Sequence, residues 1–394
     1  MMWRSAIGLL VLAGFAGCTT PYRPPVFVQG APPFPGLVGL VEASGQRPVD
    51  VILVHGMCTH SERWAHEAID RLMQAVDSNY RRPEAPSARS DAAPTTRIVP
   101  VERTESLAGG RVNFTALVWS PLTTPLKRQL AYDATGEPTD CSAPGECKPR
   151  RAKLNGRLKD GLMNDCLADA LVYQGDSRAA IQRAMIEAIG QVLEASQARA
   201  QRARVPPGPL VLVSESLGSK LAFDALSGLL ERERTAVEPK VYGVDRLALV
   251  FMGANQLPIL GLADQDIDAI GELHATSVAA TARAPKPDAL QRLLREVKAE
   301  KQRQAARVPG PSAPARIAGI HLVAFTDPND LLSYRLQSSR YAGPDVSVAD
   351  VLVSNDPTYL GLLERPDTAH KGYAQNPDVA SLIACGNPRS PSCR

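Results

Sequence analysis

The sequence predicts an α/β protein with a mostly parallel central sheet and helices on both faces. Short apolar runs that resemble buried strands alternate with segments whose apolar residues recur at helical spacing. The chain has 394 residues, 44% of them hydrophobic, which is enough to fill a substantial core. Because no internal repeat interrupts the pattern, we expect one domain with insertions.

The expected strands are short runs of branched and apolar residues between turn residues, at 37–41, 51–54, 115–119, 210–213, 247–251 and 320–325. The expected helices show apolar residues three and four positions apart, at 62–78, 164–204, 217–234 and 377–384. Strands that alternate with helices in this way favour a parallel sheet that is covered on both sides.

Three stretches interrupt this alternation and are expected to be insertions in a domain that spans 46–394. They lie near 81–110, 122–160 and 260–316. The first is rich in Pro, Ala, Arg and Ser, and we expect it to be a surface excursion. The third carries an apolar stripe at helical spacing, made of Leu290, Leu293, Leu294 and Val297. Such a stripe docks on the body of a protein or, alternatively, touches a membrane surface.

Ser216 lies where an apolar strand turns abruptly into a helix, in the stretch Ser214-Glu215-Ser216-Leu217-Gly218. A serine nucleophile on such a turn is conformationally strained, so only small residues fit two positions to either side. Gly218 meets this requirement, and Ser214 stands where a glycine is usual. The alternative is that Ser214 or Ser216 only caps the following helix.

Other polar features accompany this turn in a definite order. The strand 51–54 ends in His55-Gly56, two carboxylates follow the strand 320–325, and a histidine lies near the end of the chain. This ordered set resembles the α/β-hydrolase superfamily of serine hydrolases, esterases and lipases among them, over most of 46–394. The resemblance implies an α/β-hydrolase fold with cap-like insertions and a reaction that needs no cofactor.

The resemblance also implies a catalytic triad in the order serine, acid, histidine. Three of the six histidines follow Ser216, and two of them do not fit this order. His274 falls in an insertion, and His321 lies inside a strand that precedes the acids. His370 follows both acids in a polar loop, where catalytic side chains are common. His370 is therefore the expected base.

Two aspartates compete for the role of the acid. Asp330 precedes two apolar residues, as the acid of the family does, and we favour it. Asp327 lies at the end of the strand before Pro328, where an aspartate often only forms a turn. The chemistry needs one buried carboxylate that orients the imidazole and stabilises its protonated form.

The family further implies an oxyanion hole made of two backbone N–H groups. The residue after the nucleophile supplies one, here Leu217, and the loop after the His-Gly strand supplies the other, here Met57. Gly56 lets that loop approach the reacting carbonyl closely, because no Cβ stands in the way. His55 is expected to shape the loop and to take no proton.

The first residues predict export. Residues 1–17 contain Arg4, then an apolar run and small residues, as in a secretory signal peptide, and the run is too short to span a membrane. They end in Phe-Ala-Gly before Cys18, which resembles a bacterial lipobox with Cys18 as the lipidated residue. Ordinary cleavage that leaves a free Cys18 thiol is the alternative. Residues 18–45 would then hold the anchor, a Pro-rich tether and an early strand, and Thr19 is typical of outer-membrane lipoproteins of Gram-negative bacteria.

Six cysteines remain after Cys18, an even number that suggests disulfides in an exported chain. The close spacings favour the pairs Cys141 with Cys147 and Cys385 with Cys393, which leaves Cys58 for Cys166. Buried free thiols at Cys58 and Cys166 are the alternative. The sequence contains neither Cys-x-x-Cys nor His-Glu-x-x-His, so no metal site is expected.

The sequence therefore predicts a serine hydrolase of the cell envelope that cleaves carboxylic or lipid esters through an acyl-enzyme. The alternatives are a non-catalytic binding or structural lipoprotein on the same fold, and an acyltransferase or thioesterase with the same triad. The expected partners are an ester or lipid substrate and the membrane that holds the anchor. A formal net charge of +3 is too balanced to indicate nucleic acid.

Overall fold

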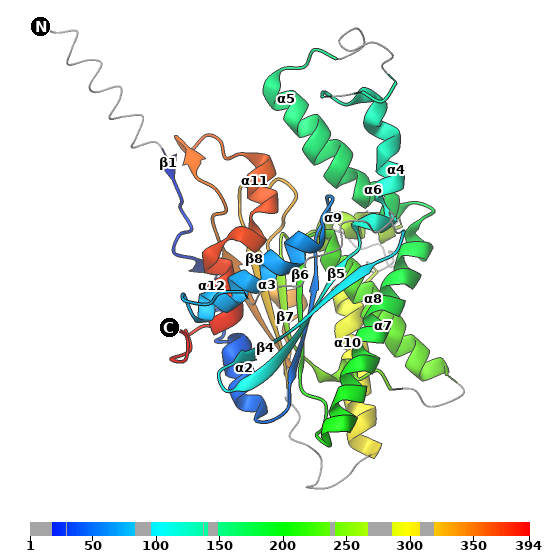
Figure 1. The fold of residues 1–394 in the computed structure, drawn as a ribbon, viewed down its shortest axis with the longest axis vertical. Helices are drawn as coiled ribbons and strands as arrows, with labels where there is room; N and C mark the ends of the chain where they lie inside the picture. The colour runs from blue at the N-terminus through cyan, green and yellow to red at the C-terminus, as the bar shows by residue number, and fades with distance from the viewer. Residues whose placement is uncertain are drawn as a thin grey trace, which may run out of the picture.

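The computed structural model describes residues 18–28, 30–82, 96–136, 138–140, 149–236, 241–266, 286–307 and 319–394. Within them, an eight-stranded sheet runs through the centre of the molecule in the order β2-β9-β8-β7-β6-β3-β5-β4 (Figure 1). The strands are β2 (Val26–Phe27), β3 (Val49–Val54), β4 (Val99–Leu107), β5 (Gly110–Val118), β6 (Leu210–Glu215), β7 (Leu247–Gly253), β8 (Ile320–Thr326) and β9 (Val346–Leu352). Only the edge strands β2 and β4 pair antiparallel among these described strands. The predicted α/β class with a mostly parallel sheet is confirmed.

Alternate side chains of the central strand β3 enter two different cores, as expected for a buried strand. Ile52 and Val54 pack in one core, and Val51 and Leu53 pack in the other. The first core lies under α7 (Arg178–Ala203), α8 (Leu217–Thr235) and α10 (Ala289–Arg307). The second lies under α2 (Gly36–Ser44), α3 (Glu62–Val76) and α12 (Pro377–Cys385). Helices therefore cover both faces of the sheet (Figure 1).

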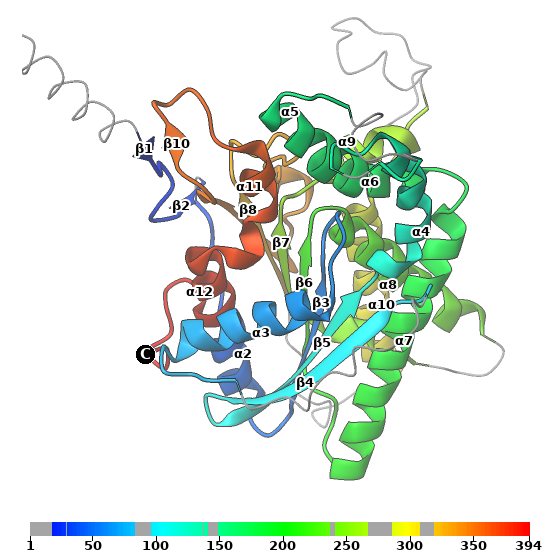
Figure 2. The same ribbon diagram turned by 45° about the horizontal axis from the view of Figure 1, so that its top comes forward.

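Shorter elements connect these layers. The strands β1 (Cys18–Thr19) and β10 (Thr358–Tyr359) form a separate two-stranded sheet. The short helices are α4 (Thr124–Lys127), α5 (Lys153–Arg157), α6 (Ala168–Gln174), α9 (Leu257–Gly261), α11 (Pro366–Lys371) and the π-helix η3 (Leu158–Leu167). The 3-10 turns are η1 (Ser120–Leu122), η2 (Arg128–Asp133), η4 (Val244–Arg246), η5 (Leu262–Asp264), η7 (Ser338–Arg340) and η8 (Tyr373–Gln375). Most of them gather at the carboxyl ends of the parallel strands, the end that Figure 2 brings forward.

The strand expected at 37–41 is wrong, because these residues belong to the helix α2. A short apolar run has no periodicity that separates a buried strand from a buried helix. Leu37, Val38, Leu40 and Val41 are all buried, and the residues at 37, 38 and 41 recur at helical spacing. The helix packs against α12, so tertiary contacts decide its conformation.

The surface excursion expected at 81–110 is also wrong in its second half, where β4 pairs with β5 at the edge of the sheet. Val101 and Leu107 are buried, and the residues between them are mostly polar and partly exposed. An edge strand exposes one face to solvent, so its polar residues hide the strand signal. The strand β9 was not predicted.

The structure also bears on the expectations for the long helix, the apolar stripe and the tether. The helix expected at 164–204 is interrupted, since α6 ends at Gln174 and α7 begins at Arg178. The apolar stripe of the third insertion lies on α10 and is buried against the body, so it does not face a membrane. The tether expected within 18–45 docks on the sheet through β2. In the part of the chain that the structure describes, we find no helix with the length and apolarity needed to cross a bilayer.

Candidate active site

The candidate residues meet at the carboxyl ends of β3, β6 and β8. These ends lie at one edge of the sheet because the three strands are parallel to one another through β7 and β6. Ligands of open α/β sheets bind outside the carboxyl ends of the strands. Figure 2 shows α6, α9 and α11 gathered over this edge.

Ser216 occupies a strained turn between β6 and α8. Its backbone has φ 52° and ψ −131°, a region that side-chain-bearing residues rarely adopt. A Cβ on Gly218 would lie 2.2 Å from the carbonyl oxygen of His55, and one on Gly56 would lie 2.8 Å from Cβ of Ser216. Only glycine fits at both places, so the turn and the loop after β3 are held in close contact.

The serine at position 214, where glycine is usual, is accommodated by hydrogen bonds. Its Oγ lies 3.0 Å from Oγ of Ser219 and 3.4 Å from the carbonyl oxygen of Phe251. The side chain therefore points away from Ser216 into partners of its own, and the turn keeps its geometry. The amide of Ser216 donates to the carbonyl oxygen of Gly253, at 2.8 Å, and ties the turn to β7.

Ser216, His370 and Asp330 form a hydrogen-bonded series. Oγ of Ser216 lies 3.3 Å from Nε2 of His370. On the other side of the ring, Nδ1 lies 2.9 and 3.0 Å from the two carboxylate oxygens of Asp330. All three residues are buried, with 2%, 5% and 3% of their surface exposed. Ser216 and His370 are 154 positions apart in the chain, and Asp330 and His370 are 40 apart, so the fold brings the three residues together.

The Asp330 carboxylate has two further donors. The amide of Leu332 donates to Oδ1 at 3.0 Å, and the hydroxyl of Tyr373 donates to Oδ2 at 3.1 Å. Tyr373 is fully buried, and burial raises the pKa of its hydroxyl well above the usual value, so it stays a donor. Sequence reasoning missed Tyr373, although it lies three residues after His370.

Asp327, the alternative acid, points elsewhere. It accepts hydrogen bonds from the amides of Asn329 and Asn355, at 2.9 and 2.6 Å. It also shares a hydrogen bond with the carboxyl of Glu364. Burial and the neighbouring Asp327 raise the pKa of Glu364 to about 7. Asp327 therefore shapes the loop around the site, and Asp330 is the carboxylate that meets His370.

His55 is locked in place on both ring nitrogens. Nδ1 lies 2.7 Å from the carbonyl oxygen of Gly56, and Nε2 accepts from the amide of Trp119 at 3.0 Å. The Trp119 indole stacks on the ring and donates to the His55 carbonyl oxygen. Burial lowers the pKa of His55 well below its usual value, so the ring is neutral. His55 holds the loop and has no nitrogen free for proton transfer.

The amides of Met57 and Leu217 flank Ser216. Leu217 follows it in the chain, and Met57 follows Gly56, where an added Cβ would lie 2.8 Å from Cβ of Ser216. Neither amide donates a hydrogen bond to any residue that the structure describes. Both residues are buried, so two unpaired donors lie next to the serine.

The loop after β3 is clamped to η3 and α6. Cys58 and Cys166 form a disulfide, which confirms that predicted pair. The Cys58 amide donates to a carboxylate oxygen of Asp169 at 2.8 Å, and Lys127 pairs with the same carboxylate at 3.1 Å. Asp165 pairs with Lys127 at 2.9 Å. Cys58, Asp165 and Cys166 lie close together, but the two sulfurs are bonded to each other and cannot bind a metal. Sequence reasoning missed Lys127 and both aspartates.

The second disulfide within the described residues joins Cys385 and Cys393, as predicted. Cys141 and Cys147 lie outside the described residues. Cys18 is exposed in β1 and forms no disulfide with any cysteine of the described residues. Disulfides form and persist in oxidising compartments, so these two bonds indicate an exported location.

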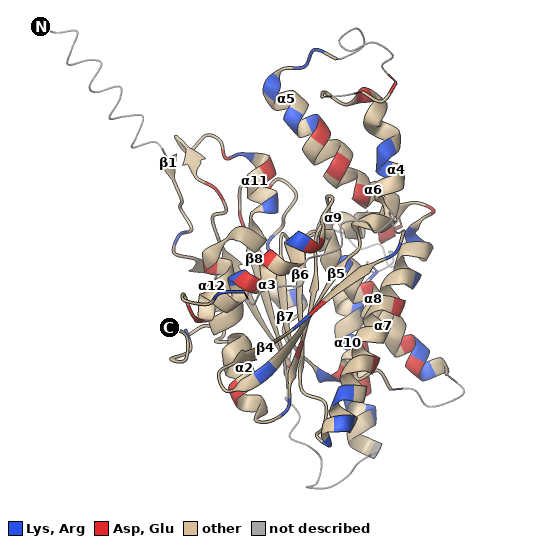
Figure 3. Cartoon of the chain, in the orientation of Figure 1, with Lys and Arg blue, Asp and Glu red and all other residues tan. Residues whose placement is uncertain are grey.

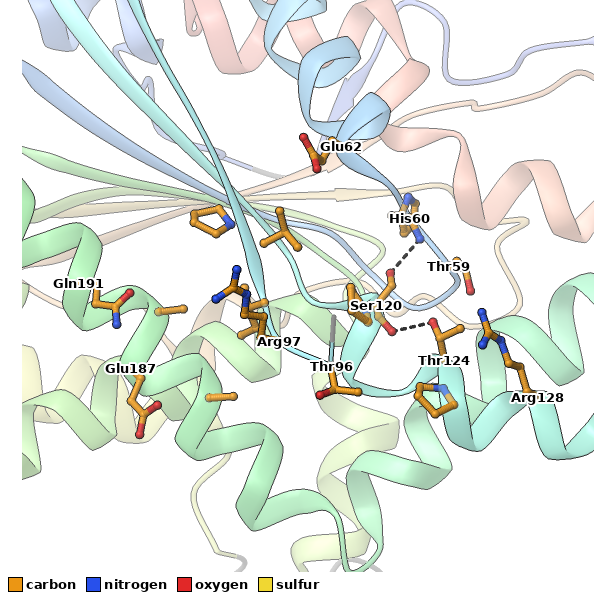
Figure 4. A pocket seen from close by; sticks show the side chains of 17 residues that line it. Thr59, His60, Glu62, Thr96, Arg97, Ser120, Thr124, Arg128, Glu187 and Gln191 are labelled. Carbon is orange, nitrogen blue, oxygen red and sulfur yellow. Dashed lines mark hydrogen bonds between the residues drawn. The ribbon is translucent and has the colours of Figure 1, made fainter. Parts of the chain in front are cut away.

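A cavity of about 880 Å³ opens between the clamped loop, β4 and α7 (Figure 4). The amide of His60 donates to Oγ of Ser120 in its wall, at 2.8 Å. Burial lowers the pKa of His60 to about 4, so the ring is neutral. Ser216 and His370 do not line this cavity, and we assign it no role in the candidate chemistry.

The structure thus brings Ser216, His370 and Asp330 within hydrogen-bond distance, while the role of the Met57 and Leu217 amides stays a prediction. A scan against protein-family models found no match for this chain, and a search of curated proteins found no relative. The geometry of the site is therefore the basis on which its chemistry is assigned.

Proposed function

We propose that the chain is a serine hydrolase with the α/β-hydrolase fold that cleaves carboxylic esters, lipid esters among them. The observation that carries the proposal is the hydrogen-bonded series from Ser216 through His370 to Asp330 on a strained strand-to-helix turn. A nucleophile, a base within reach and a third group that orients the base are the signature of covalent catalysis. Strain of this kind is commonly kept where function needs it.

In the acylation step, Oγ of Ser216 bonds to the ester carbonyl carbon, and Nε2 of His370 takes its proton. The carbonyl π electrons move to the oxygen and form a tetrahedral oxyanion. When this intermediate collapses, the bond to the alcohol oxygen breaks and His370 returns the proton to the leaving alcohol. Water then attacks the acyl-enzyme by the same route and releases the acid.

Asp330 orients the ring and stabilises the protonated imidazole that forms in each step. Its carboxylate accepts from Nδ1 of His370, from Tyr373 and from the Leu332 amide. The amides of Met57 and Leu217 are the donors for the oxyanion. One such donor is worth roughly 10²–10³ in kcat in serine hydrolases. The clamp on Cys58 supports the Met57 donor by fixing the residue that follows it.

We further propose that the protein is a lipoprotein of the bacterial envelope, anchored in the outer membrane through acylated Cys18. The signal-like sequence of residues 1–17, the exposed Cys18 and the two disulfides support this location. Arg and Glu residues are interspersed along α7 (Figure 3), so this helix does not present the uniformly basic face that nucleic acid binding favours.

The proposal is tested by hydrolysis of p-nitrophenyl esters from acetate to dodecanoate. We expect turnover by the wild type and a loss of at least about 10³-fold in Ser216→Ala, because the covalent route disappears. Ser227→Ala, in the helix α8 that follows Ser216, is the matched control, since the Ser227 Oγ is buried without a hydrogen-bond partner in the described residues. Equal activity of Ser216→Ala and the wild type would overturn the proposal. Identification of the free acid as product separates hydrolysis from acyl transfer.

A further inference from the structure

Residues 359–363 form a tight hairpin tip beside α11. The amide of Leu362 donates to the carbonyl oxygen of Tyr359 at 3.0 Å, and the Tyr359 amide donates to that of Leu363 at 2.7 Å. Leu360 and Gly361 both have positive φ, 54° and 66°, which is the geometry of a type I′ turn. Asparagine or glycine normally fills the first of these positions, so a leucine there is held against its conformational preference.

The side chains of this tip are apolar and face outward. Leu360 is 67% exposed, Leu362 84% and Leu363 56%, and the ring of Tyr359 is about half exposed. No charged residue occurs in 358–363. Clusters of exposed apolar side chains on this scale mark a surface that another phase or molecule covers.

The charges that follow the tip are turned away from it or neutralised. Glu364 is buried and accepts from the side-chain amide of Asn329 at 2.8 Å. The Arg365 guanidinium pairs with Asp367 at 2.8 Å. An uncharged tip with three exposed leucines suits the boundary between lipid headgroups and acyl chains, and we take a bilayer as its partner.

The tip lies where the amino-terminal segment leaves the described structure. Cys18 pairs with Tyr359 and Thr19 with Thr358 in the β1–β10 sheet, and the two threonine hydroxyls lie 2.7 Å apart. Figure 2 shows β1 and β10 side by side near α11, which carries His370. The chain before Cys18 contains the apolar run of residues 6–15. Either this apolar run or acyl chains attached to Cys18 would have affinity for lipid, and both are joined to the chain at the residue that pairs with the tip.

We propose that the tip 359–363 inserts into the same phospholipid bilayer as the group attached at Cys18 and turns the active-site edge toward the lipid. Leu331, which follows Asp330, is 69% exposed on the same edge of the sheet. The orientation extends the proposed function, because it presents Ser216 to acyl esters that lie in the membrane. This proposal depends on the proposed lipid anchor, because the anchor supplies the bilayer. Its test does not require the protein to be a catalyst.

Tryptophan fluorescence tests the insertion. Full chain is reconstituted into phosphatidylcholine vesicles whose acyl chains are brominated, with Leu362→Trp as the reporter. Val241→Trp is the matched control, since Val241 is 40% exposed and precedes β7 at the opposite edge of the sheet. An interfacial residue reaches roughly 5–10 Å into the boundary between headgroups and acyl chains. We therefore expect several-fold stronger bromine quenching for Leu362→Trp than for Val241→Trp, unchanged by high salt.

Equal quenching of the two reporters, or full chain that does not associate with vesicles, overturns the proposal. The same pair of reporters in a Ser216→Ala background should give the same difference. If the chain with Ser216 intact does not hydrolyse esters but the difference in quenching remains, the membrane orientation stands and only the proposed enzyme is refuted. Ester hydrolysis with equal quenching of the two reporters would support the proposed enzyme and refute the membrane orientation.

Discussion

The hydroxyl of Tyr373 lies 3.1 Å from Oδ2 of Asp330 and also accepts a hydrogen bond from the amide of Asp327. This one buried ring therefore ties the carboxylate that meets His370 to the end of β8. A hydrogen bond to a charged group contributes about 1.5–3 kcal/mol, so Tyr373 is expected to fix the position of Asp330.

Tyr373→Phe is predicted to lower kcat for ester hydrolysis roughly tenfold with little change in KM, because the acid loses a donor without leaving the site. Steady-state kinetics on a soluble ester measures the effect, and thermal unfolding checks that the fold is kept. A change confined to KM would show that Tyr373 acts on substrate binding instead.

Substitutions of Asp330 and Asp327 are predicted to have different effects on activity and stability. Asp330→Asn is predicted to reduce kcat about 10³–10⁴-fold, since the amide cannot stabilise the protonated His370 ring. Asp327→Asn removes a carboxylate that accepts two backbone amides and should cost about 1–2 kcal/mol of stability with a much smaller loss of kcat. Parallel kinetics and urea unfolding of both variants measure this difference. A larger kcat loss in Asp327→Asn would reverse the assignment.

Gly56→Ala is predicted to reduce activity about 100-fold or more, because its Cβ would lie 2.8 Å from Cβ of Ser216 and displace the adjoining Met57 amide. Gly161→Ala is the control, since nothing lies within 4 Å of the Cβ it would add. Fluorophosphonate labelling rates of the two variants give the comparison. Similar labelling rates for Gly56→Ala and the wild type would show that the loop after β3 does not contribute to the site.

Glu215 gives a pH prediction. Its carboxyl, in a small pocket with Trp64 and Arg71, has its pKa raised to about 7 by burial. Above about pH 4.3 the unfolded chain loses this proton while the folded chain keeps it, so stability falls as pH rises from about 4.3 to about 7 and then stays level. Glu215→Gln should therefore unfold like the wild type near pH 4 and be more stable by about 2 kcal/mol near pH 8, allowing for partial exposure. Urea unfolding at both pH values checks this, and a variant that gains nothing at pH 8 contradicts it.

The order of features along the chain was a better guide than any single motif. It led to Ser216, Asp330 and His370, which the structure places within hydrogen-bond distance, while their catalytic roles stay a prediction. Contacts between distant residues leave no local pattern, so Lys127, Asp169 and Tyr373 escaped notice.

The errors in the fold have a similar cause. The run at 37–41 has too few residues to show a period, and its packing against α12 makes it helical. The edge strand β4 looked like a loop because its solvent-facing residues are polar. The strands β3, β6, β7 and β8 and the helices α3, α8 and α12 had strongly apolar or long periodic patterns, and these were predicted correctly.

The most direct test of the account is mass spectrometry of the folded, oxidised protein after reaction with a fluorophosphonate. We predict one adduct per chain, carried by the peptide that contains Ser216, with no adduct in Ser216→Ala. An unmodified protein, or an adduct on another serine, would contradict the proposal that Ser216 is an activated nucleophile.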